Sequence, residues 1–172
     1  MNTFFINLVG GPGSNKTAIA AGLYAALKNS VSNVEILYNS VTRHILQNDT
    51  LLLSSQIPIF GEELLQMLSI NGKASICIRD CSLLNNIVYD IENNQLFHAL
   101  VLQEYKKFTN IDFFINREGL TIDENEYDIK QCLAIDQRVK DVYRYANIPL
   151  LEADANTAVE DIISYIQGDM SE

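Results

Sequence analysis

Residues 10–17 read Gly-Gly-Pro-Gly-Ser-Asn-Lys-Thr, and their position between two regular segments decides the fold class. The residues before them, TFFINLV at 3–9, are rich in β-branched and aromatic types and predict a buried strand. The residues after them, 16–28, carry apolar side chains at i, i+4, i+7 and i+8 from Ile19 and predict a helix. A strand, a glycine-rich loop and a helix in this order are what a phosphate-binding site requires.

The loop follows the P-loop pattern, in which four variable residues separate a glycine from Gly-Lys-Ser/Thr, at every position but one. Asn15 stands where the pattern has its second glycine. A plain strand-to-helix turn would also explain the glycines and the proline, but it has no need of Lys-Thr directly after them. We therefore predict a nucleotide-phosphate site, with a magnesium ligand at the threonine, formed by Gly10, Gly11, Pro12, Gly13, Ser14, Asn15, Lys16 and Thr17.

Asn15 affects this site in two opposite ways. Asparagine is the residue other than glycine that best tolerates left-handed backbone geometry, so we expect the loop to close. Its Cβ and amide nevertheless stand where the backbone approaches phosphate, and the left-handed conformation costs about 1 kcal/mol. We expect reduced nucleotide affinity.

A dinucleotide-binding loop is the weaker alternative for the same stretch. Gly11 and Gly13 begin the G-x-G-x-x-G pattern, but Lys16 occupies the position of its third glycine. Asn39 stands at the end of the next predicted strand, where that class of site carries an acidic residue.

The rest of the chain alternates between strand and helix patterns, which predicts an α/β fold with a parallel sheet covered by helices on both faces. We expect a single domain with a P-loop over residues 1–172. Further strands are predicted at 34–38, 73–79, 111–115 and 148–151; helices at 40–47, 58–71, 95–108, 127–146 and about 159–166; and a loop at 48–56.

Two features beyond the loop bear on chemistry. Asp80 directly follows the apolar segment 73–79, where P-loop proteins place a second magnesium-orienting acid, although an aspartate that caps the next segment would look the same. Residues 118–126, EGLTIDENE, lack periodicity and carry four acids, so we expect a lid-like connection at about 117–127.

Composition narrows the function class. A formal net charge of −10 disfavours an extended nucleic-acid-binding face. No apolar run approaches the roughly 20 residues of a membrane span, and the N-terminus has no signal-peptide pattern, so we expect a cytoplasmic protein without a membrane partner. Three cysteines without C-x-x-C spacing indicate reduced thiols, and two histidines leave little for a histidine metal site.

Over nearly its whole length the chain resembles small phage P-loop ATPases or kinases that are related to nucleoside-monophosphate kinases. The resemblance implies a three-layer P-loop NTPase fold with a five-stranded parallel sheet, ATP and Mg²⁺ at the loop, and phosphoryl transfer to a nucleotide, nucleoside or modified base. It assigns catalysis to Lys16 and Asp80 and the metal to Thr17 and Asp80; Arg117, at the edge of the expected lid, is a further catalytic candidate. The segments that carry it are GGPGSNKT, VEILYNSVTRHIL, QIPIFGEELLQM, ICIRDCSLL, FHALVLQEY and NIPLLEAD.

The chain departs from the family pattern at several chemical positions. Ser40 stands where relatives have an acceptor-side glutamate, Cys81 replaces the serine of Asp-Ser-Pro, and His98 stands where an arginine is expected. The acidic lid segment lacks arginines and leaves Arg117 at its edge.

These departures leave two interpretations open. An arginine aimed at the transferred phosphoryl group is worth about a thousandfold or more, and the four candidates Arg43, Arg79, Arg117 and Arg138 compensate only if they converge. The first interpretation is an active magnesium-dependent phosphotransferase. The second is a catalytically degenerate kinase homologue that acts as a protein-binding or inhibitory module.

Overall fold

The computed structural model describes residues 2–117 and 128–169, without the side chains of residues 42, 43 and 51. Its centre is a five-stranded, wholly parallel sheet in the order β2-β3-β1-β4-β5, which confirms the predicted α/β class. The strands are β1 (Phe4–Val9), β2 (Val34–Leu37), β3 (Ile76–Arg79), β4 (Thr109–Asn116) and β5 (Leu151–Asp154).

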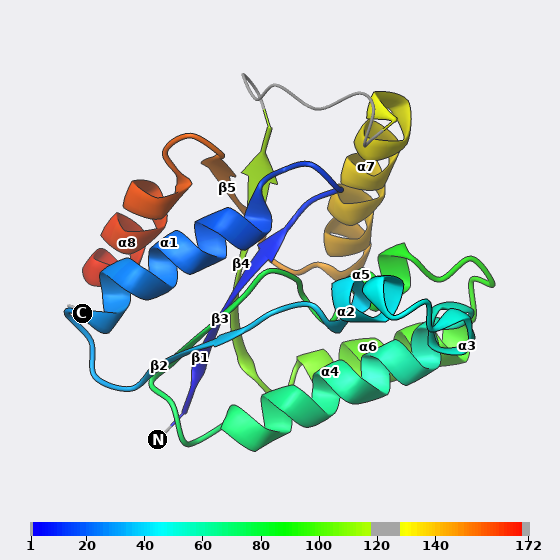
Figure 1. The fold of residues 1–172 in the computed structure, drawn as a ribbon, viewed down its shortest axis with the longest axis horizontal. Coiled ribbons are helices and arrows are strands. Elements are labelled where there is room, and N and C mark those ends of the chain that lie inside the picture. The colour runs from blue at the N-terminus through cyan, green and yellow to red at the C-terminus, as the bar shows by residue number, and fades with distance from the viewer. Residues whose placement is uncertain (1, 118–127, 170–172) are drawn as a thin grey trace.

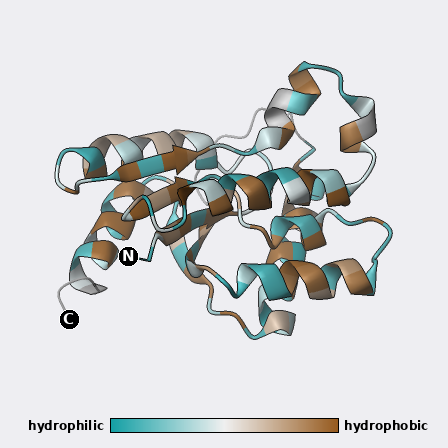
Figure 2. Cartoon of the chain, turned by 90° about the horizontal axis from the view of Figure 1, so that it is seen from below, coloured by the Kyte–Doolittle hydropathy of each residue, from teal (hydrophilic) through white to brown (hydrophobic). Residues whose placement is uncertain are grey.

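Helices cover both faces of this sheet (Figure 1). Helices α1 and α8 pack on one face in a core that includes Ile19, Leu23 and Ile162. The second core lies on the other face, where Phe60, Phe97 and Tyr143 come from α4, α6 and α7. Along most helices hydrophobic and hydrophilic stretches alternate, as expected of helices with one buried side (Figure 2). The helices are α1 (Lys16–Lys28), α2 (Ser40–Leu46), α3 (Thr50–Leu53), α4 (Gln56–Ile70), α5 (Asn85–Val88), α6 (Gln95–Tyr105), α7 (Ile129–Ala146) and α8 (Ala158–Asp169).

Three segments differ from their predictions. The expected loop at 48–56 contains α3, because the Asp49 carboxylate accepts a hydrogen bond from the Leu52 backbone N–H at 3.2 Å and begins a helical turn. The last strand begins at Leu151 instead of Ile148, because Pro149 has no N–H to donate to a ladder. Helix α5 was not predicted. The expected lid falls on residues 118–127, outside the described residues.

The sheet order brings the predicted chemical residues to one edge. Strand β1 lies between β3 and β4, and Asn7 of β1 pairs in register with Arg79 of β3. The loop that follows β1 and Asp80, which follows β3, therefore leave the sheet side by side at its carboxyl edge. In open parallel sheets this edge is where ligands bind. No helix in the described part of the chain is long and apolar enough to cross a membrane.

Candidate nucleotide site

The glycine-rich loop connects β1 to α1 through three residues with positive φ. Gly10 has φ 141° and Gly13 φ 74°, and Asn15 adopts the left-handed conformation at φ 63°, ψ 17°. The backbone thus has the geometry that the sequence predicts for an asparagine in place of the second glycine. The Ser14 hydroxyl donates to the Gly11 carbonyl at 2.9 Å and closes the loop on itself.

Lys16 lies across this loop. Its Nζ donates to the Gly11 carbonyl at 2.8 Å and to Ser14 Oγ at 2.9 Å. Burial, helped by the nearby positive charge of Arg117, lowers the pKa of Lys16 to about 8, although Asp80 and Asp136 partly oppose the shift. The ammonium group is therefore held at the helix N-terminus, where an anion would add to its stabilisation.

This lowered pKa predicts a proton uptake on nucleotide binding. A polyphosphate next to Nζ favours the charged lysine, so at about pH 9 binding draws a proton onto Lys16. Above about pH 8 the free protein holds a neutral lysine, and affinity for ATP is expected to fall, by at most about tenfold per pH unit. Calorimetry in two buffers of different ionisation enthalpy measures the uptake. Flat affinity without proton uptake would contradict this prediction, and Lys140→Met, which removes an exposed ion pair with Glu152, should leave the uptake unchanged.

The two predicted magnesium ligands touch each other. Thr17 Oγ1 donates to Asp80 Oδ2 at 2.9 Å, and the Asn39 backbone N–H donates to Asp80 Oδ1 at 2.6 Å. A hydroxyl and a carboxylate are hard oxygen donors, and Mg²⁺ needs only one or two protein ligands when phosphates and waters complete its shell. The donors therefore fit this ion, although no group of three or more acidic, histidine or cysteine side chains in the described residues could hold a metal alone.

Arg117 lies behind the loop. Its guanidinium donates to Asp136 through Nε and Nη2, both at 2.9 Å, and through Nη1 to the Pro12 carbonyl at 2.5 Å. Asp136, on α7, also accepts the Gly11 N–H at 2.6 Å. Arg117 and Asp136 together attach the loop to α7, and a role for Arg117 in charge stabilisation of the transferred phosphate stays a prediction.

Gly11 has no room for a side chain at this contact. A Cβ there would lie 2.7 Å from the backbone carbonyl of Cys132 and 2.9 Å from Arg117 Nη2. The glycine thus serves the close approach of α7, in addition to any approach of phosphate.

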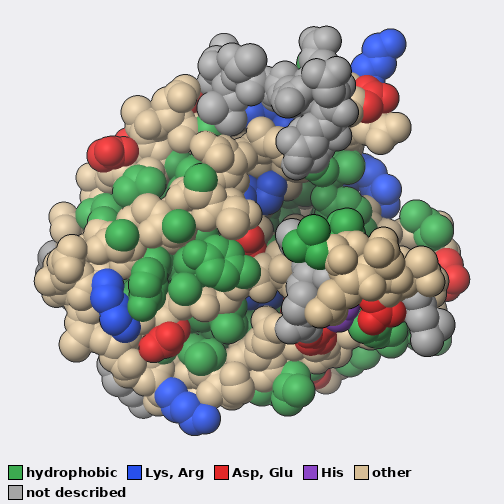
Figure 3. Space-filling model, viewed as in Figure 1, with side chains coloured by type: hydrophobic (Ala, Val, Ile, Leu, Met, Phe, Trp, Pro, Cys, Tyr) green, Lys and Arg blue, Asp and Glu red, His purple; other side chains and the backbone are tan. Residues whose placement is uncertain are grey.

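A cavity of about 860 Å³ opens in front of the loop. Figure 3 shows this side of the molecule hollowed near its middle, with charged side chains deep inside. The described lining comes from the loop, from α1 to α5 and from the ends of β2 and β3; it consists of Gly10, Pro12, Gly13, Asn15, Lys16, Thr17, Ala18, Asn39, Val41, Ile45, Leu53, Gln56, Ile59, Glu63, Asp80, Asn85, Asn86 and Tyr89.

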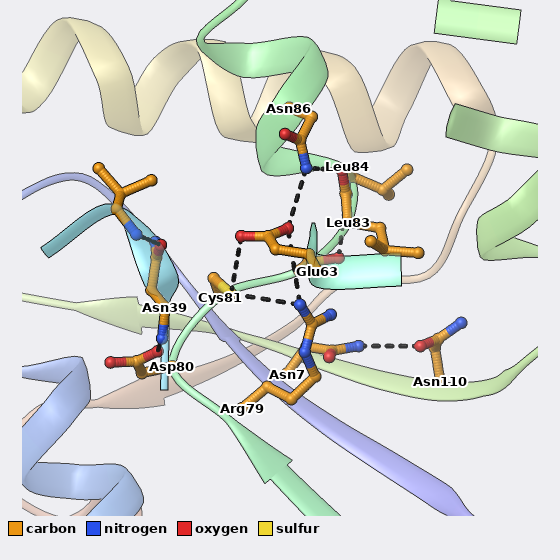
Figure 4. A network of polar contacts seen from close by, with 12 residues as sticks. Asn7, Asn39, Glu63, Arg79, Asp80, Cys81, Leu83, Leu84, Asn86 and Asn110 are labelled. Atoms are coloured by element: carbon orange, nitrogen blue, oxygen red, sulfur yellow. Dashed lines mark hydrogen bonds and ion pairs between the residues drawn. The ribbon is translucent and has the colours of Figure 1, made fainter. Parts of the chain in front are cut away.

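A buried polar network reaches the cavity wall at Glu63 and Asn86 and continues behind it to Arg79 and Cys81 (Figure 4). Glu63 of α4 accepts from Asn86 Nδ2 at 2.9 Å and lies 3.6 Å from Arg79 Nη2. The Cys81 thiol lies 3.6 Å from the other Glu63 oxygen and accepts from Arg79 Nη2 at 3.4 Å. Burial raises the pKa of Glu63, and the charge of Arg79 opposes that rise.

The sequence did not single out Glu63 or Asp136. Each occupies the buried stripe of an amphipathic helix, with Ile59 and Met67 four residues to either side of Glu63. Asp136 likewise shares the buried face of α7 with Cys132 and Val139. An acid within an apolar stripe is the signal that would have found both, because such an acid is buried and must have partners.

The other residues that depart from the family pattern lie in different surroundings. Ser40 is buried at the start of α2, and Cys81 belongs to the Glu63 network. His98 pairs with Asp90 at 2.9 Å beside a separate cavity of about 610 Å³ that Arg138 also lines. Arg79, Arg117 and Arg138 thus have three different environments and do not converge, and the side chain of Arg43 lies outside the described part of the chain.

Comparison with known proteins places this geometry in a known fold. A thymidylate kinase from Ehrlichia chaffeensis matches with a TM-score of 0.65 at 14% identity, over 96% of this chain and 100% of that one. A deoxyadenosine kinase from M. mycoides with products dCMP and a flexible dCDP bound matches with a TM-score of 0.61 at 17% identity, over 95% of this chain and 99% of that one. A structure of deoxyadenosine kinase from M. mycoides with bound dATP matches with a TM-score of 0.57 at 16% identity, over 98% of this chain and 100% of that one.

The chain shares its fold with this thymidylate kinase and this deoxyadenosine kinase. Neither the family models nor the curated proteins compared with the chain include a match. At identities of 14% to 17% the structural likeness establishes the fold alone, so activity has to be argued from the site.

Proposed function

We propose that the chain binds ATP with Mg²⁺ at residues 10–17 and transfers the γ-phosphate to a nucleotide, nucleoside or modified base in the adjoining cavity. The observation that carries this proposal is the Thr17–Asp80 hydrogen bond at 2.9 Å beside Lys16. A strand-to-helix turn that binds no ligand does not require a hydroxyl, a carboxylate and an ammonium group together at one helix N-terminus.

The reaction would follow the usual course of phosphoryl transfer. An acceptor oxygen, from a hydroxyl of a nucleoside or modified base or from the phosphate of a nucleotide, bonds to the γ-phosphorus; the bond from that phosphorus to the β,γ-bridging oxygen breaks, and ADP leaves with the electron pair. Where the acceptor is a hydroxyl, its proton passes to a carboxylate, and Asp80 and Glu63 are the acids in the described lining. When bound, Mg²⁺ would neutralise charge on the phosphate oxygens, while Lys16 approaches the terminal phosphates.

The two kinases of similar fold support an acceptor that is a nucleoside or a nucleotide, and they do not decide between these compounds. One is a kinase of thymidylate and the other of deoxyadenosine, and both cover nearly the whole chain. A phosphate-transfer assay with radiolabelled ATP across nucleosides, nucleoside monophosphates and hydroxymethylated DNA tests the proposal. Transfer that requires Mg²⁺ supports it, and the absence of ATP binding would overturn it.

A degenerate kinase homologue that binds a protein partner is the second candidate, and Asn15 favours it. The Asn15 side chain lines the cavity and makes no capping hydrogen bond to α1. It therefore takes space at the phosphate position without stabilising the helix in return.

Asn15→Gly separates the two candidates. We expect the variant to bind Mg²⁺-ATP about fivefold more tightly, because it removes the Asn15 side chain from the place where the backbone approaches phosphate. The left-handed backbone is present without ligand, so its cost of about 1 kcal/mol affects folding stability and not affinity. Calorimetric titration of wild type and variant measures the change. Rising phosphate transfer in the variant supports an enzyme, whereas tighter ATP binding without any transfer supports the binding module; weaker binding would contradict our account of Asn15. Asn33→Gly, at another left-handed asparagine away from the cavity, is the control.

A further inference from the structure

The charges around the cavity are unevenly placed. Among the described residues that line it, the charged side chains are Lys16, Glu63 and Asp80. Lys16 belongs to the loop and Asp80 touches Thr17, so both lie at the phosphate end. The wall made by α2 to α5 offers one carboxylate, Glu63, and no cation within the described lining.

This wall is also rich in hydrogen-bond acceptors. Asn85 and Asn86 are 8% and 2% exposed, and the Oδ1 atom of each lacks a hydrogen-bond partner among the described residues. Asn86 Nδ2 donates to Glu63 and to the Leu83 carbonyl, and these two hydrogen bonds fix the orientation of the side-chain amide. A buried acceptor without a donor destabilises the site, so a ligand that brings N–H or O–H groups is favoured here.

Arg79 does not supply the missing cation. It is 2% exposed, does not line the cavity, and directs Nη2 toward Glu63 and Cys81 (Figure 4). Its Nε and Nη1 have no described partner, but Glu63 neutralises its charge. An acceptor phosphate would have to displace Glu63 to reach this guanidinium, and would otherwise stand near two carboxylates.

We propose that the acceptor is an uncharged nucleoside and not a nucleoside monophosphate, and that Glu63, Asn85 and Asn86 accept hydrogen bonds from its hydroxyl and amino groups. This inference rests on the proposed function and specifies its acceptor. A monophosphate is disfavoured because it brings two negative charges to a wall without a described cation.

Equilibrium binding to the full chain tests this inference without requiring turnover. The four common deoxynucleosides and their 5′-monophosphates are titrated by calorimetry, each with and without Mg²⁺-ATP. At least one nucleoside is expected to bind about tenfold or more tightly than its own monophosphate. The inference is overturned if every monophosphate binds as well as its nucleoside, or if none of these ligands binds at millimolar concentration.

The same titrations keep the two proposals apart. ATP binding together with a preference for monophosphates overturns the acceptor inference and leaves the proposed function standing. Nucleoside binding without any ATP binding overturns the proposed function and leaves the preference for a nucleoside standing.

The variant Glu63→Gln tests whether Glu63 binds the nucleoside. The variant is expected to lose about tenfold or more in nucleoside affinity, because an acceptor with full charge becomes a neutral amide, while its ATP affinity stays unchanged. Glu104→Gln makes the same charge change on α6, at an ion pair with Lys107 outside the cavity lining, and should change neither affinity. Unchanged nucleoside affinity in folded Glu63→Gln overturns the role of Glu63; if the variant does not fold, the wild-type comparison of nucleoside with monophosphate still decides the inference.

Discussion

Asp80→Asn is expected to lower the rate of phosphoryl transfer about a hundredfold or more and to weaken the Mg²⁺ dependence of ATP binding, with little effect on folding. The asparagine oxygen can still accept one of the two hydrogen bonds that come from Thr17 Oγ1 and the Asn39 N–H. What is lost is the negative charge that would orient Mg²⁺ and its waters. Steady-state kinetics and thermal unfolding measure the two effects.

Asp161→Asn is the matched control for this variant. The Thr157 hydroxyl, directly before α8, donates to Asp161 Oδ2 of α8 at 2.6 Å, which makes an exposed threonine–aspartate pair outside the cavity lining. Transfer rates should match wild type in this control. A wild-type transfer rate and wild-type Mg²⁺ dependence in Asp80→Asn would contradict the role of Asp80 in orienting Mg²⁺.

Arg117→Met is expected to destabilise the protein by about 3–5 kcal/mol, because it leaves the Asp136 carboxylate buried with only the Gly11 N–H as a described partner. For a chain of this length the loss corresponds to about 6–20 °C in the melting temperature. Differential scanning calorimetry measures it. Arg144→Met removes an exposed ion pair with Asp141 and is expected to change stability by less than about 1 kcal/mol.

This comparison also decides what Arg117 does. If it holds the loop to α7, the second substitution Asp136→Asn should restore part of the stability, because it removes the unpaired charge. A melting temperature equal to wild type, together with lost transfer, would instead show that Arg117 acts on the phosphate.

Local patterns predicted most of the fold. The helix expected at 16–28 is α1 with the same bounds, because its apolar spacing and the glycines before it agree. The last strand was predicted to begin three residues too early. Ile148 and Leu150 are apolar and pack against the core, but they precede the hydrogen-bonded ladder of β5. Hydrophobicity predicts burial there without predicting strand pairing.

The site was predictable where one motif, or the shared edge of parallel strands, contains it. Lys16 and Thr17 are adjacent in the motif, and Asp80 could be placed because parallel strands end at one edge. Asp136 meets Gly11 across 125 positions of sequence, and Glu63 meets Asn86 across 23. Such contacts depend on how α4 and α7 pack on the sheet, which the spacing of a single helix does not determine.

The most direct test of the account is a calorimetric titration of the wild-type chain with ATP, with and without Mg²⁺, at about pH 7. The contacts among Lys16, Thr17 and Asp80 predict saturable binding of one ATP that Mg²⁺ strengthens and that Lys16→Met abolishes. No binding of ATP at millimolar concentration, or binding that Lys16→Met leaves unchanged, would contradict the central claim that residues 10–17 form a nucleotide site.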